Sequence, residues 1–206
     1  VASLTRPIAT ADERRRARAE LLAARLAMPA SMRRAADAGI RARLAVLLAA
    51  RAWPLGERVI AAYWPMQGEP DLRPLFADWA ATGARLVLPA VVERGAPLRF
   101  ARYAPGGALR EGAHGTFEPA GRDWLSPDVV VVPCVGFSDA GWRLGYGGGY
   151  YDRTLAGLAA LRVGVAYEES GLPGLRPEPH DVALDFVVTQ ERLVECAPAR
   201  RSDDRR

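Results

Sequence analysis

A chain of 206 residues is long enough for one globular domain with a substantial core. Half of the residues are hydrophobic and a quarter are charged, a composition that argues against disorder over most of the length. The formal net charge is +4, and the sequence contains many arginines but no lysine. We attribute this to a bias toward Ala, Arg, Gly and Pro, because nucleic-acid binding would need clustered charge with interleaved aromatic residues.

No apolar stretch approaches the roughly 20 residues needed to cross a bilayer, and no apolar N-terminal segment resembles a secretory signal. The arginine-rich start is similar to a mitochondrial transit peptide, but Asp12, Glu13 and Glu20 interrupt it, and such peptides avoid acidic residues. Cys134 and Cys196 lie far apart and lack the spacing of a metal site. We therefore expect a cytoplasmic protein with no membrane or nucleic-acid partner.

The first 54 residues predict two amphipathic helices. Apolar residues recur at helical spacing between arginines from 12 to 28, and Pro29 ends the pattern. A second helix is expected to begin at Ser31, as its N-cap, and to close at Trp53 and Pro54. Its apolar face is formed by Ile40, Leu44, Leu47 and Leu48.

From residue 58 onward, short apolar segments alternate with helical ones. Pro89 is expected to stop the second strand, and the more alternating third strand suits a position near an edge. The four consecutive valines from Val129 suit a parallel strand buried on both faces. The pattern predicts an α/β fold, a three-layer sandwich with a mainly parallel sheet and helices on both faces. Strands are expected over 58–64, 85–88, 98–103, 128–132, 161–166 and 185–188, and helices over 71–82 and 150–160.

The remaining segments are irregular. Residues 103–127 are rich in Gly and Pro and lack a sustained period, so we expect an excursion that is able to cover a site. No repeat or linker is evident, which predicts a single domain over 1–197 and a disordered tail over 198–206. Ligands of parallel sheets bind beyond the carboxyl ends of the strands, where residues 136–150 would lie.

The segment RLGYGGGYYD, residues 143–152, carries the strongest chemical signal. Glycine occupies four of the five positions from Gly145 to Gly149, so the backbone can adopt positive φ angles and approach a ligand closely. If the loop turns into a helix at Tyr150, its N–H groups converge as in an anion site. Arg143 adds a planar donor for phosphate.

Two common phosphate signatures are excluded. The Walker A loop needs a lysine, which the chain lacks, and the G-x-G-x-x-G pattern fails because Tyr150 stands where its last glycine is required. A glycine cluster alone would favour a flexible link between a strand and a helix over a binding loop. The combination with an arginine, two tyrosines and an aspartate favours a binding loop.

The run VVPCVGFSDAGWRLGYGGGYYDR, residues 131–153, closely resembles the signature of the 5-formyltetrahydrofolate cyclo-ligases, also called 5,10-methenyltetrahydrofolate synthetases. The resemblance extends over nearly the whole chain. Five weaker blocks carry it: AAYWPMQGEPD, LVLPAV, LRFARY, HGTFEP and PHDVALDFVVT.

The resemblance implies an ATP-dependent conversion of 5-formyltetrahydrofolate to 5,10-methenyltetrahydrofolate, with ADP and phosphate as the other products. The formyl oxygen would attack the γ-phosphate, N10 of the folate would attack the activated carbon, and phosphate would leave. Such an enzyme must mainly align two substrates and neutralise phosphate charge, which suits a glycine loop and arginines better than an acid–base triad. The implied substrates are small molecules, and we expect a monomer.

The resemblance also assigns roles to residues. Arg143 and Tyr151 match catalytic positions. Trp64 and Glu69 match folate-contacting positions, together with loop residues Tyr146, Gly147, Gly148, Gly149 and Tyr150. The positions that match ATP contacts are Arg14, Arg18, Arg143, Leu144, Gly145, Tyr146, Gly147, Gly148, Gly149, Tyr150 and Tyr151.

Mg²⁺ is the implied metal, and Asp152 and Asp181 match its ligand positions. Magnesium prefers oxygen ligands and needs only one or two carboxylates beside phosphate and water. Asp152 could instead cap the following helix or pair with Arg153, and His180 fits a structural partner better than a ligand. Arg14 replaces a residue that is usually lysine, which keeps the charge but changes its reach.

Several of these assignments have structural alternatives. Arg14 and Arg18 share a helix face that could simply be solvated, and Trp64 could be an ordinary core residue. Tyr150 and Tyr151 could stack on a ligand or anchor the helix. A sugar-phosphate isomerase or coenzyme A transferase relative would share the α/β architecture without needing ATP, and a non-catalytic RNA-binding relative would lack the metal carboxylates.

Overall fold

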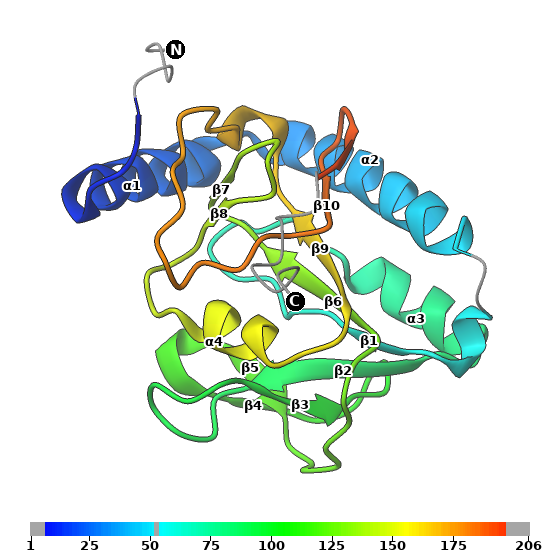
Figure 1. Cartoon of the computed structure of the whole chain (residues 1–206). Helices are drawn as coiled ribbons and strands as arrows, with labels where there is room; N and C mark the ends of the chain where they lie inside the picture. Colours follow the sequence, from blue (N-terminus) through cyan, green and yellow to red (C-terminus); the bar gives the residue numbers. More distant parts are fainter. Residues whose placement is uncertain (1–6, 52–53, 197–206) are drawn as a thin grey trace, which may run out of the picture.

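The computed structural model of the chain describes residues 7–51 and 54–196. Its centre is a seven-stranded sheet with the order β11-β10-β9-β6-β1-β2-β3 (Figure 1). The inner strands run parallel, whereas the edge strands β3 and β11 run antiparallel to their neighbours. The strands are β1 (Val59–Ala61), β2 (Arg85–Ala90), β3 (Arg99–Arg102), β6 (Val129–Pro133), β9 (Leu161–Val165), β10 (Phe186–Val188) and β11 (Leu193–Glu195).

Helices cover both faces of the sheet and one end of it (Figure 1). The helices α2 (Ala30–Ala49) and α3 (Arg73–Ala81) pack on one face, and the short helix α4 (Tyr150–Ala156) packs on the other. The helix α1 (Ala11–Ala27) lies beyond the carboxyl ends of the strands. No helix in the described ranges combines the length and apolar character needed to span a bilayer.

Smaller elements surround this frame. The segment 103–127 holds the hairpin β4 (Leu109–Glu111) and β5 (Phe117–Pro119), joined through the 3-10 turn η2 (Ala113–Gly115). The hairpin β7 (Gly136–Phe137) and β8 (Arg143–Leu144) follows β6. Two further 3-10 turns are η1 (Leu55–Glu57) and η3 (Glu168–Ser170).

The core lies on the two faces of the sheet, and alternation along each strand decides which face a residue serves. In β6, Val129 and Val131 pack with the side chains of α2 and α3, while Val130 and Val132 pack with Leu155 of α4. All four valines are fully buried. The central strand therefore stabilises both layers.

A third, smaller core fastens α1 to the rest of the molecule. It contains Ile8, Ala17, Leu144, Leu172 and Leu175. The helix begins with a capping box, in which the Thr10 hydroxyl accepts a bond from the Glu13 N–H and the Glu13 carboxylate accepts one from the Thr10 N–H. These contacts fix the helix face that carries the arginines.

The sheet order creates a crevice between β1 and β6. The chain leaves β1 to form β2 on one side, and leaves β6 to form β9 on the other side. No crossover connection therefore covers the space beyond the carboxyl ends of this pair. Ligands of open α/β sheets bind at such a switch point.

Most predicted elements are confirmed, with some shorter bounds. The fold class, the edge position of β3 and the fully buried β6 agree with the sequence. The strand expected over 58–64 is limited to Val59–Ala61, and the helix expected over 150–160 ends at Ala156, before Gly157. The segment 103–127, expected to be irregular, contains the β4–β5 hairpin.

Two expectations are wrong, and three short strands are not predicted by the sequence. Ser31 is not the N-cap of α2, because the helix begins at Ala30 after Pro29. Pro89 does not stop β2. Pairing of β2 with β1 ends at Val87, so beyond Val87 the strand is paired only with β3. The N–H group that proline lacks is therefore a smaller loss of hydrogen bonding than in a strand paired on both sides. The glycine-rich segment contains β7 and β8, and β10 is followed by another strand, β11.

Two expectations lie outside the described residues. The close of the second helix at Trp53 is one of them, although α2 itself ends at Ala49. The disordered tail over 198–206 is the other, and the single domain over 1–197 likewise stays a prediction.

Candidate functional site

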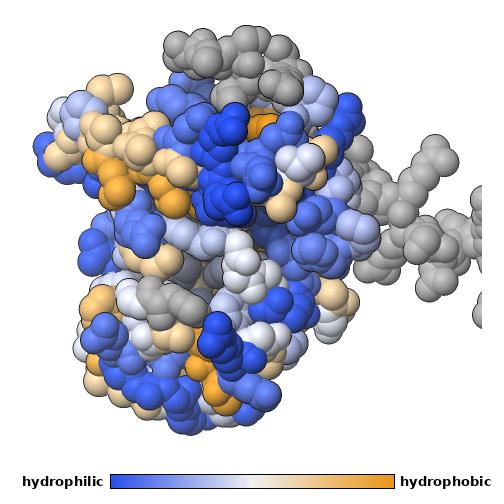
Figure 2. Space-filling view, turned by 90° about the vertical axis from the view of Figure 1, so that its left-hand side faces the viewer, coloured by the Kyte–Doolittle hydropathy of each residue, from blue (hydrophilic) through white to orange (hydrophobic). Residues whose placement is uncertain are grey.

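A cavity of about 600 Å³ opens at the switch point between β1 and β6. Its walls come from α1, the segment after β1, the glycine loop between β8 and α4, and residues 178–181, with Thr116 and Phe117 from the segment expected to cover a site. The face in Figure 2 is hollowed between an upper and a lower part, and hydrophilic residues predominate around the hollow. Segments far apart in sequence thus share one cavity.

The cavity brings together every predicted site residue except Leu144. Leu144 is fully buried in the small core that holds α1, and its carbonyl accepts a bond from Val135, so its side chain cannot reach a ligand. The residues that line the cavity are Arg14, Arg18, Trp64, Glu69, Arg143, Gly145, Tyr146, Gly147, Gly148, Gly149, Tyr150, Tyr151, Asp152 and Asp181.

The glycine loop needs glycine at defined positions. Gly147 has φ +94° and Gly149 has φ +65°, a backbone region in which side chains are strained. A Cβ atom at Gly147 would also lie 3.5 Å from the Arg18 guanidinium carbon. Gly145 has neither restriction, since it lacks a positive φ and has nothing within 4 Å of a Cβ position. Gly149 precedes α4, which is only seven residues long.

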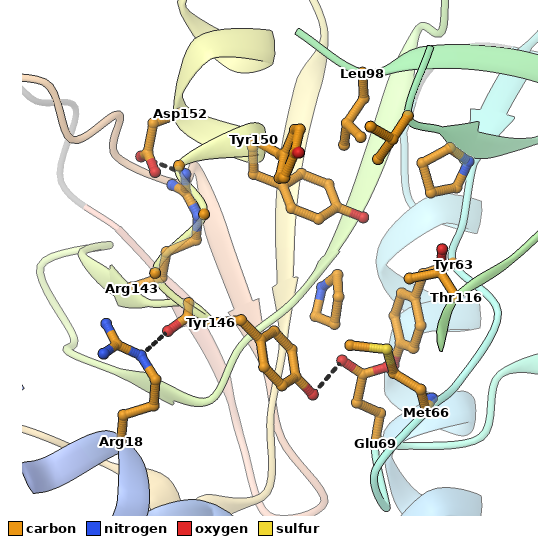
Figure 3. A pocket seen from close by; sticks show the side chains of 18 of the residues that line it. Arg18, Tyr63, Met66, Glu69, Leu98, Thr116, Arg143, Tyr146, Tyr150 and Asp152 are labelled. Atoms are coloured by element: carbon orange, nitrogen blue, oxygen red, sulfur yellow. Dashed lines mark hydrogen bonds and ion pairs between the residues drawn. The ribbon is translucent and has the colours of Figure 1, made fainter. Parts of the chain in front are cut away.

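An ion pair joins the two ends of the glycine loop. One guanidinium nitrogen of Arg143 donates to Asp152 Oδ1 (Figure 3). The other donates to the Val182 carbonyl over 2.5 Å. Asp152 Oδ1 also accepts the Val182 N–H over 3.2 Å. The pairing of Asp152 with Arg153 is therefore not observed; Arg153 donates to the Gly148 carbonyl instead.

Arg14 forms a second charged group with the segment before Val182. Its Nη2 donates to Asp181 Oδ2 over 2.6 Å, and its Nη1 lies 3.5 Å from a carboxylate oxygen of Glu178. Asp181 Oδ2 also accepts the Glu178 N–H over 2.9 Å. Arg14 is only 7% exposed, so the solvated-face alternative is wrong for it.

Arg18 lies one turn further along α1. Its Nε donates to the Gly145 carbonyl over 2.5 Å (Figure 3), and burial, with the nearby Arg14 charge, lowers its pKa. Within the described ranges, no acceptor takes its two terminal nitrogens, which face Gly147. These nitrogens remain available to an anion in the cavity.

The opposite end of the cavity holds one buried carboxyl group, that of Glu69. Its Oε1 accepts the Tyr146 hydroxyl over 2.8 Å (Figure 3), and its Oε2 accepts the Met66 N–H over 2.9 Å. Burial raises the pKa of Glu69 to about 7, although both hydrogen bonds and the charge of Arg25 oppose the shift. A group poised near neutral pH in a cavity is a candidate for function.

The aromatic residues differ in their surroundings. Burial raises the pKa of Tyr151, so its hydroxyl stays protonated and can donate but not act as a base. Trp64 packs partly against the core, edge-on to Tyr103 at 6.0 Å, and also lines the cavity. Tyr150 lines the cavity with the Arg153 guanidinium 5.1 Å from its ring centre.

Sequence reasoning missed two charged residues. Glu178 belongs, with His180 and Asp181, to a group whose potential ligand atoms lie within 4.8 Å of one another. What indicates it in the sequence is that this acidic residue stands three positions before Asp181. Arg25 is buried behind the cavity and donates to the Tyr146 hydroxyl. Its signal was its spacing from Arg14, which puts both on one helix face.

The carboxylates suit a hard metal ion. Asp152 and Asp181 offer oxygen atoms, and each binds its hydrogen-bond partners among the described residues through a single oxygen, which leaves the other for a ligand. The backbone of Val182, which follows Asp181, hydrogen-bonds Asp152, so the two carboxylates approach the same part of the cavity. This all-oxygen set fits Mg²⁺.

Comparison with known proteins decides the family. Residues 10–190 match the sequence profile of the 5-formyltetrahydrofolate cyclo-ligase family. A protein of that name from Mycolicibacterium smegmatis is 33% identical over 187 residues, which cover 85% of this chain and 92% of the relative. The chain belongs to the 5-formyltetrahydrofolate cyclo-ligase family. A second relative of the same name, from Escherichia coli, is 34% identical over 66% of this chain and 80% of its own length.

Solved structures agree with this assignment of a cyclo-ligase fold. The 5,10-methenyltetrahydrofolate synthetase of Aquifex aeolicus matches with a TM-score of 0.77 and 29% identity, over 91% of this chain and 95% of the other. The fold is also that of the synthetase from Mycoplasma pneumoniae, with a TM-score of 0.70 over 86% and 98% of the two chains. Membership of this enzyme family excludes the isomerase and transferase alternatives.

The buried carboxyl of Glu69 predicts that stability falls with rising pH. Its pKa of about 7 in the folded state lies above the ordinary 4.5, so the folded state holds the proton more tightly than the unfolded state. The free energy of unfolding should therefore fall by up to about 3 kcal/mol as the pH rises from 4.5 to 7, and then level off. Glu69→Gln should lack this loss.

Urea unfolding of both proteins across this pH range measures the effect. The difference in unfolding free energy between the two proteins isolates Glu69, because the other titrating groups are shared. A difference that stays constant between pH 4.5 and 7 would contradict the prediction.

Proposed function

We propose that this family member is an ATP- and magnesium-dependent 5-formyltetrahydrofolate cyclo-ligase. It converts 5-formyltetrahydrofolate to 5,10-methenyltetrahydrofolate and releases ADP and phosphate. One observation carries the proposal: the glycine loop with its arginines and the buried Glu69 carboxyl face the same cavity of about 600 Å³. A single cavity with a phosphate-binding end and a heterocycle-binding end suits a reaction between a nucleotide and a folate.

The folate ring would bind at the Glu69 end. An ionised carboxylate accepts hydrogen bonds, and a pterin presents several N–H groups on one edge. Trp64 and Tyr63 border this region and supply apolar surface for a flat ring. The pKa of about 7 means that Glu69 is largely ionised at slightly alkaline pH, where it accepts such bonds.

The phosphates of ATP would bind at the glycine loop. The backbone N–H groups of residues 145–149 and the terminal nitrogens of Arg18 are donors at this end. Arg14 and Arg143 add positive charge, and both are buried, where charge acts more strongly than in water. This arrangement aligns the γ-phosphate with a formyl group held beside it.

The reaction then needs alignment more than proton transfer. The formyl oxygen attacks the γ-phosphorus and ADP leaves; N10 attacks the activated carbon and loses its proton to solvent, and the formyl oxygen leaves as part of phosphate. Arg143 neutralises charge on the transferred group, while the protonated Tyr151 donates to an oxygen of it. A side chain that remains protonated suits this role because no base is required there.

Asp152 and Asp181 would hold Mg²⁺ through their oxygen atoms, with Glu178 beside Asp181. The bound ion supplies charge neutralisation between phosphate groups. Before such binding, Arg143 and Arg14 hold the two carboxylates in place by direct ion pairs. The aspartates thus keep their positions in the cavity wall without the ion.

We also propose that the protein works as a monomer in the cytoplasm on small-molecule substrates. The described residues of one chain supply hydrogen-bond donors and acceptors at both ends of the cavity, which supports the monomer proposal. Both cysteines are free, as expected in a reducing compartment.

The activity has a direct test. The protein is mixed with 5-formyltetrahydrofolate, ATP and MgCl₂, and the methenyl product is followed by its near-ultraviolet absorbance. We expect product formation that stops when ATP is omitted or magnesium is chelated. A folded sample that gives no ATP-dependent product would overturn the proposed function.

Asp152→Asn should impair turnover far more than folding. The amide keeps the size of the carboxylate but loses its charge, so turnover should fall on the order of 100-fold. Loss of the ion pair with Arg143 should lower the melting temperature, but the protein should remain folded at the assay temperature. Asp139→Asn is the matched control, because Asp139 is exposed and pairs with Arg192 away from the cavity. Equal rates for the Asp152 variant and the wild type would remove Asp152 from the site.

Two alanine substitutions in the glycine loop should differ sharply in their effect on the KM for ATP. Gly147→Ala places a side chain in the left-handed region at a cost of about 1–2 kcal/mol. The free loop should leave this conformation to avoid the strain and must return to it when ATP binds, so the KM for ATP should rise about 5- to 30-fold. Gly145→Ala adds the same methyl group where space is open and φ is not positive. Steady-state kinetics of both variants test the difference, and equal KM values would contradict it.

A further inference from the structure

Arg25 is a buried cation that no predicted role explains. It lies on α1, is only 7% exposed and does not line the cavity. Its Nη2 donates to the Tyr146 hydroxyl over 3.1 Å, and its Nη1 donates to the Cys134 carbonyl over 3.5 Å. Within the part of the chain that the structure describes, no carboxylate lies within 4 Å of it. A buried charge without a direct ionic partner is costly, so its retention calls for a reason.

The Tyr146 hydroxyl connects this cation to the substrate end of the cavity. It accepts the bond from Arg25 and donates its own proton to Glu69 Oε1 over 2.8 Å. The guanidinium also lies 5.8 Å from the centre of the Tyr146 ring, a distance at which a cation is attracted to the ring. Two consecutive hydrogen bonds thus run from Arg25 to the carboxylate, and both have the polarity that favours an ionised Glu69.

We propose that Arg25 is a positioning residue that acts through Tyr146: it fixes the Tyr146 hydroxyl against Glu69 and keeps the Glu69 carboxylate ionised to receive the N–H groups of the folate. This inference rests on the proposed function. It adds a specific unit, Arg25–Tyr146–Glu69, in which a residue outside the cavity controls the charge of one inside it.

The other groups around Glu69 cannot replace Arg25. The titratable side chains that interact with Glu69 from neighbouring elements are Tyr63, Cys134, Tyr146 and Tyr151. Burial raises the pKa of each of them, so all four remain neutral near pH 7. Arg25 is the cation whose charge favours the ionised form of Glu69. Its removal should therefore leave Glu69 protonated at higher pH.

The test measures the titration of Glu69 itself, in protein without ligand. The ¹³C shift of the glutamate side-chain carboxyl is followed by NMR against pH, and Glu69→Gln identifies the signal. In the wild type we expect a midpoint near pH 7. In Arg25→Met, which keeps the length but loses the charge and the donors, the midpoint should rise by about one pH unit or more. Arg25→Lys should fall between these two proteins.

Further variants show whether Arg25 acts through Tyr146. Tyr146→Phe removes only the hydroxyl and should also raise the midpoint. In the double variant the rise should be smaller than the sum of the single rises, because both substitutions break one chain of bonds. Arg16→Met is the matched control: Arg16 is exposed on the same helix, and its loss changes the net charge equally but should leave the midpoint unaltered.

The binding of 5-formyltetrahydrofolate without nucleotide gives a second readout. If the midpoint rises from about 7 to about 8, the ionised fraction of Glu69 at pH 7.5 falls about threefold, so the Kd in Arg25→Met should rise about threefold there. At about pH 9 the two Kd values should converge. Failure of every protein, the wild type included, to bind this folate would overturn the proposed function, while the NMR titration would still decide the link to Glu69.

An unaltered Glu69 midpoint in Arg25→Met, or rises that simply add in the double variant, would overturn the proposal. If Arg25→Met does not fold, Arg25→Lys and Tyr146→Phe carry the test. An unaltered midpoint in both would then overturn it in the same way.

Discussion

Parallel pairing of β1 with β6 determines where everything else in this protein can lie. The chain departs from these neighbours toward opposite edges of the sheet, so no connection covers the space beyond their carboxyl ends. That space receives the loop after β1, which carries Glu69, and the loop after β8, which carries the glycines. The fully buried valines of β6 hold the strand from both faces, so the floor of the crevice is rigid. The position of the cavity therefore follows from the order of the strands in the sheet and not from any single side chain.

Helix α1 completes the cavity from outside the sheet, and charge governs how it does so. Its cationic side chains bind groups of two distant segments: Arg14 binds Asp181, whereas Arg18 binds the Gly145 carbonyl and Arg25 binds the Tyr146 hydroxyl. In a chain without lysine, the planar guanidinium serves each of these sites. One guanidinium can bind two acceptors at once, as Arg14 does with Asp181 and the Arg176 carbonyl. The helix is therefore held by directional bonds as well as by its small apolar core.

The sequence predicted the order of elements because period and burial are local properties. Four valines in a row indicate a central strand whatever their neighbours are, and the structure agrees. Short elements were missed because β7, β8 and β11 have two or three residues each, too few to show a period. The expectation for Pro89 was wrong because a strand tolerates proline where one of its sides is unpaired. Which part of β2 is unpaired depends on the tertiary structure and cannot be read from the local sequence. Site residues within the family motifs were found; Arg25 shows only its helical spacing from Arg14, and its role depends on Tyr146 lying beside it in space.

The ion pair between Arg143 and Asp152 makes the glycine loop a closed ring of backbone. Glycine-rich segments lose more conformational entropy on ordering than others, at about 1–2 kcal/mol per residue fixed. An open loop would lose that entropy when a nucleotide binds, and its affinity would suffer accordingly. Here the ring forms when the protein folds, because both ends are also bonded to Val182. The loop therefore loses its conformational entropy when the protein folds and not when the nucleotide binds, so a segment rich in glycine can present rigid donors to its ligand.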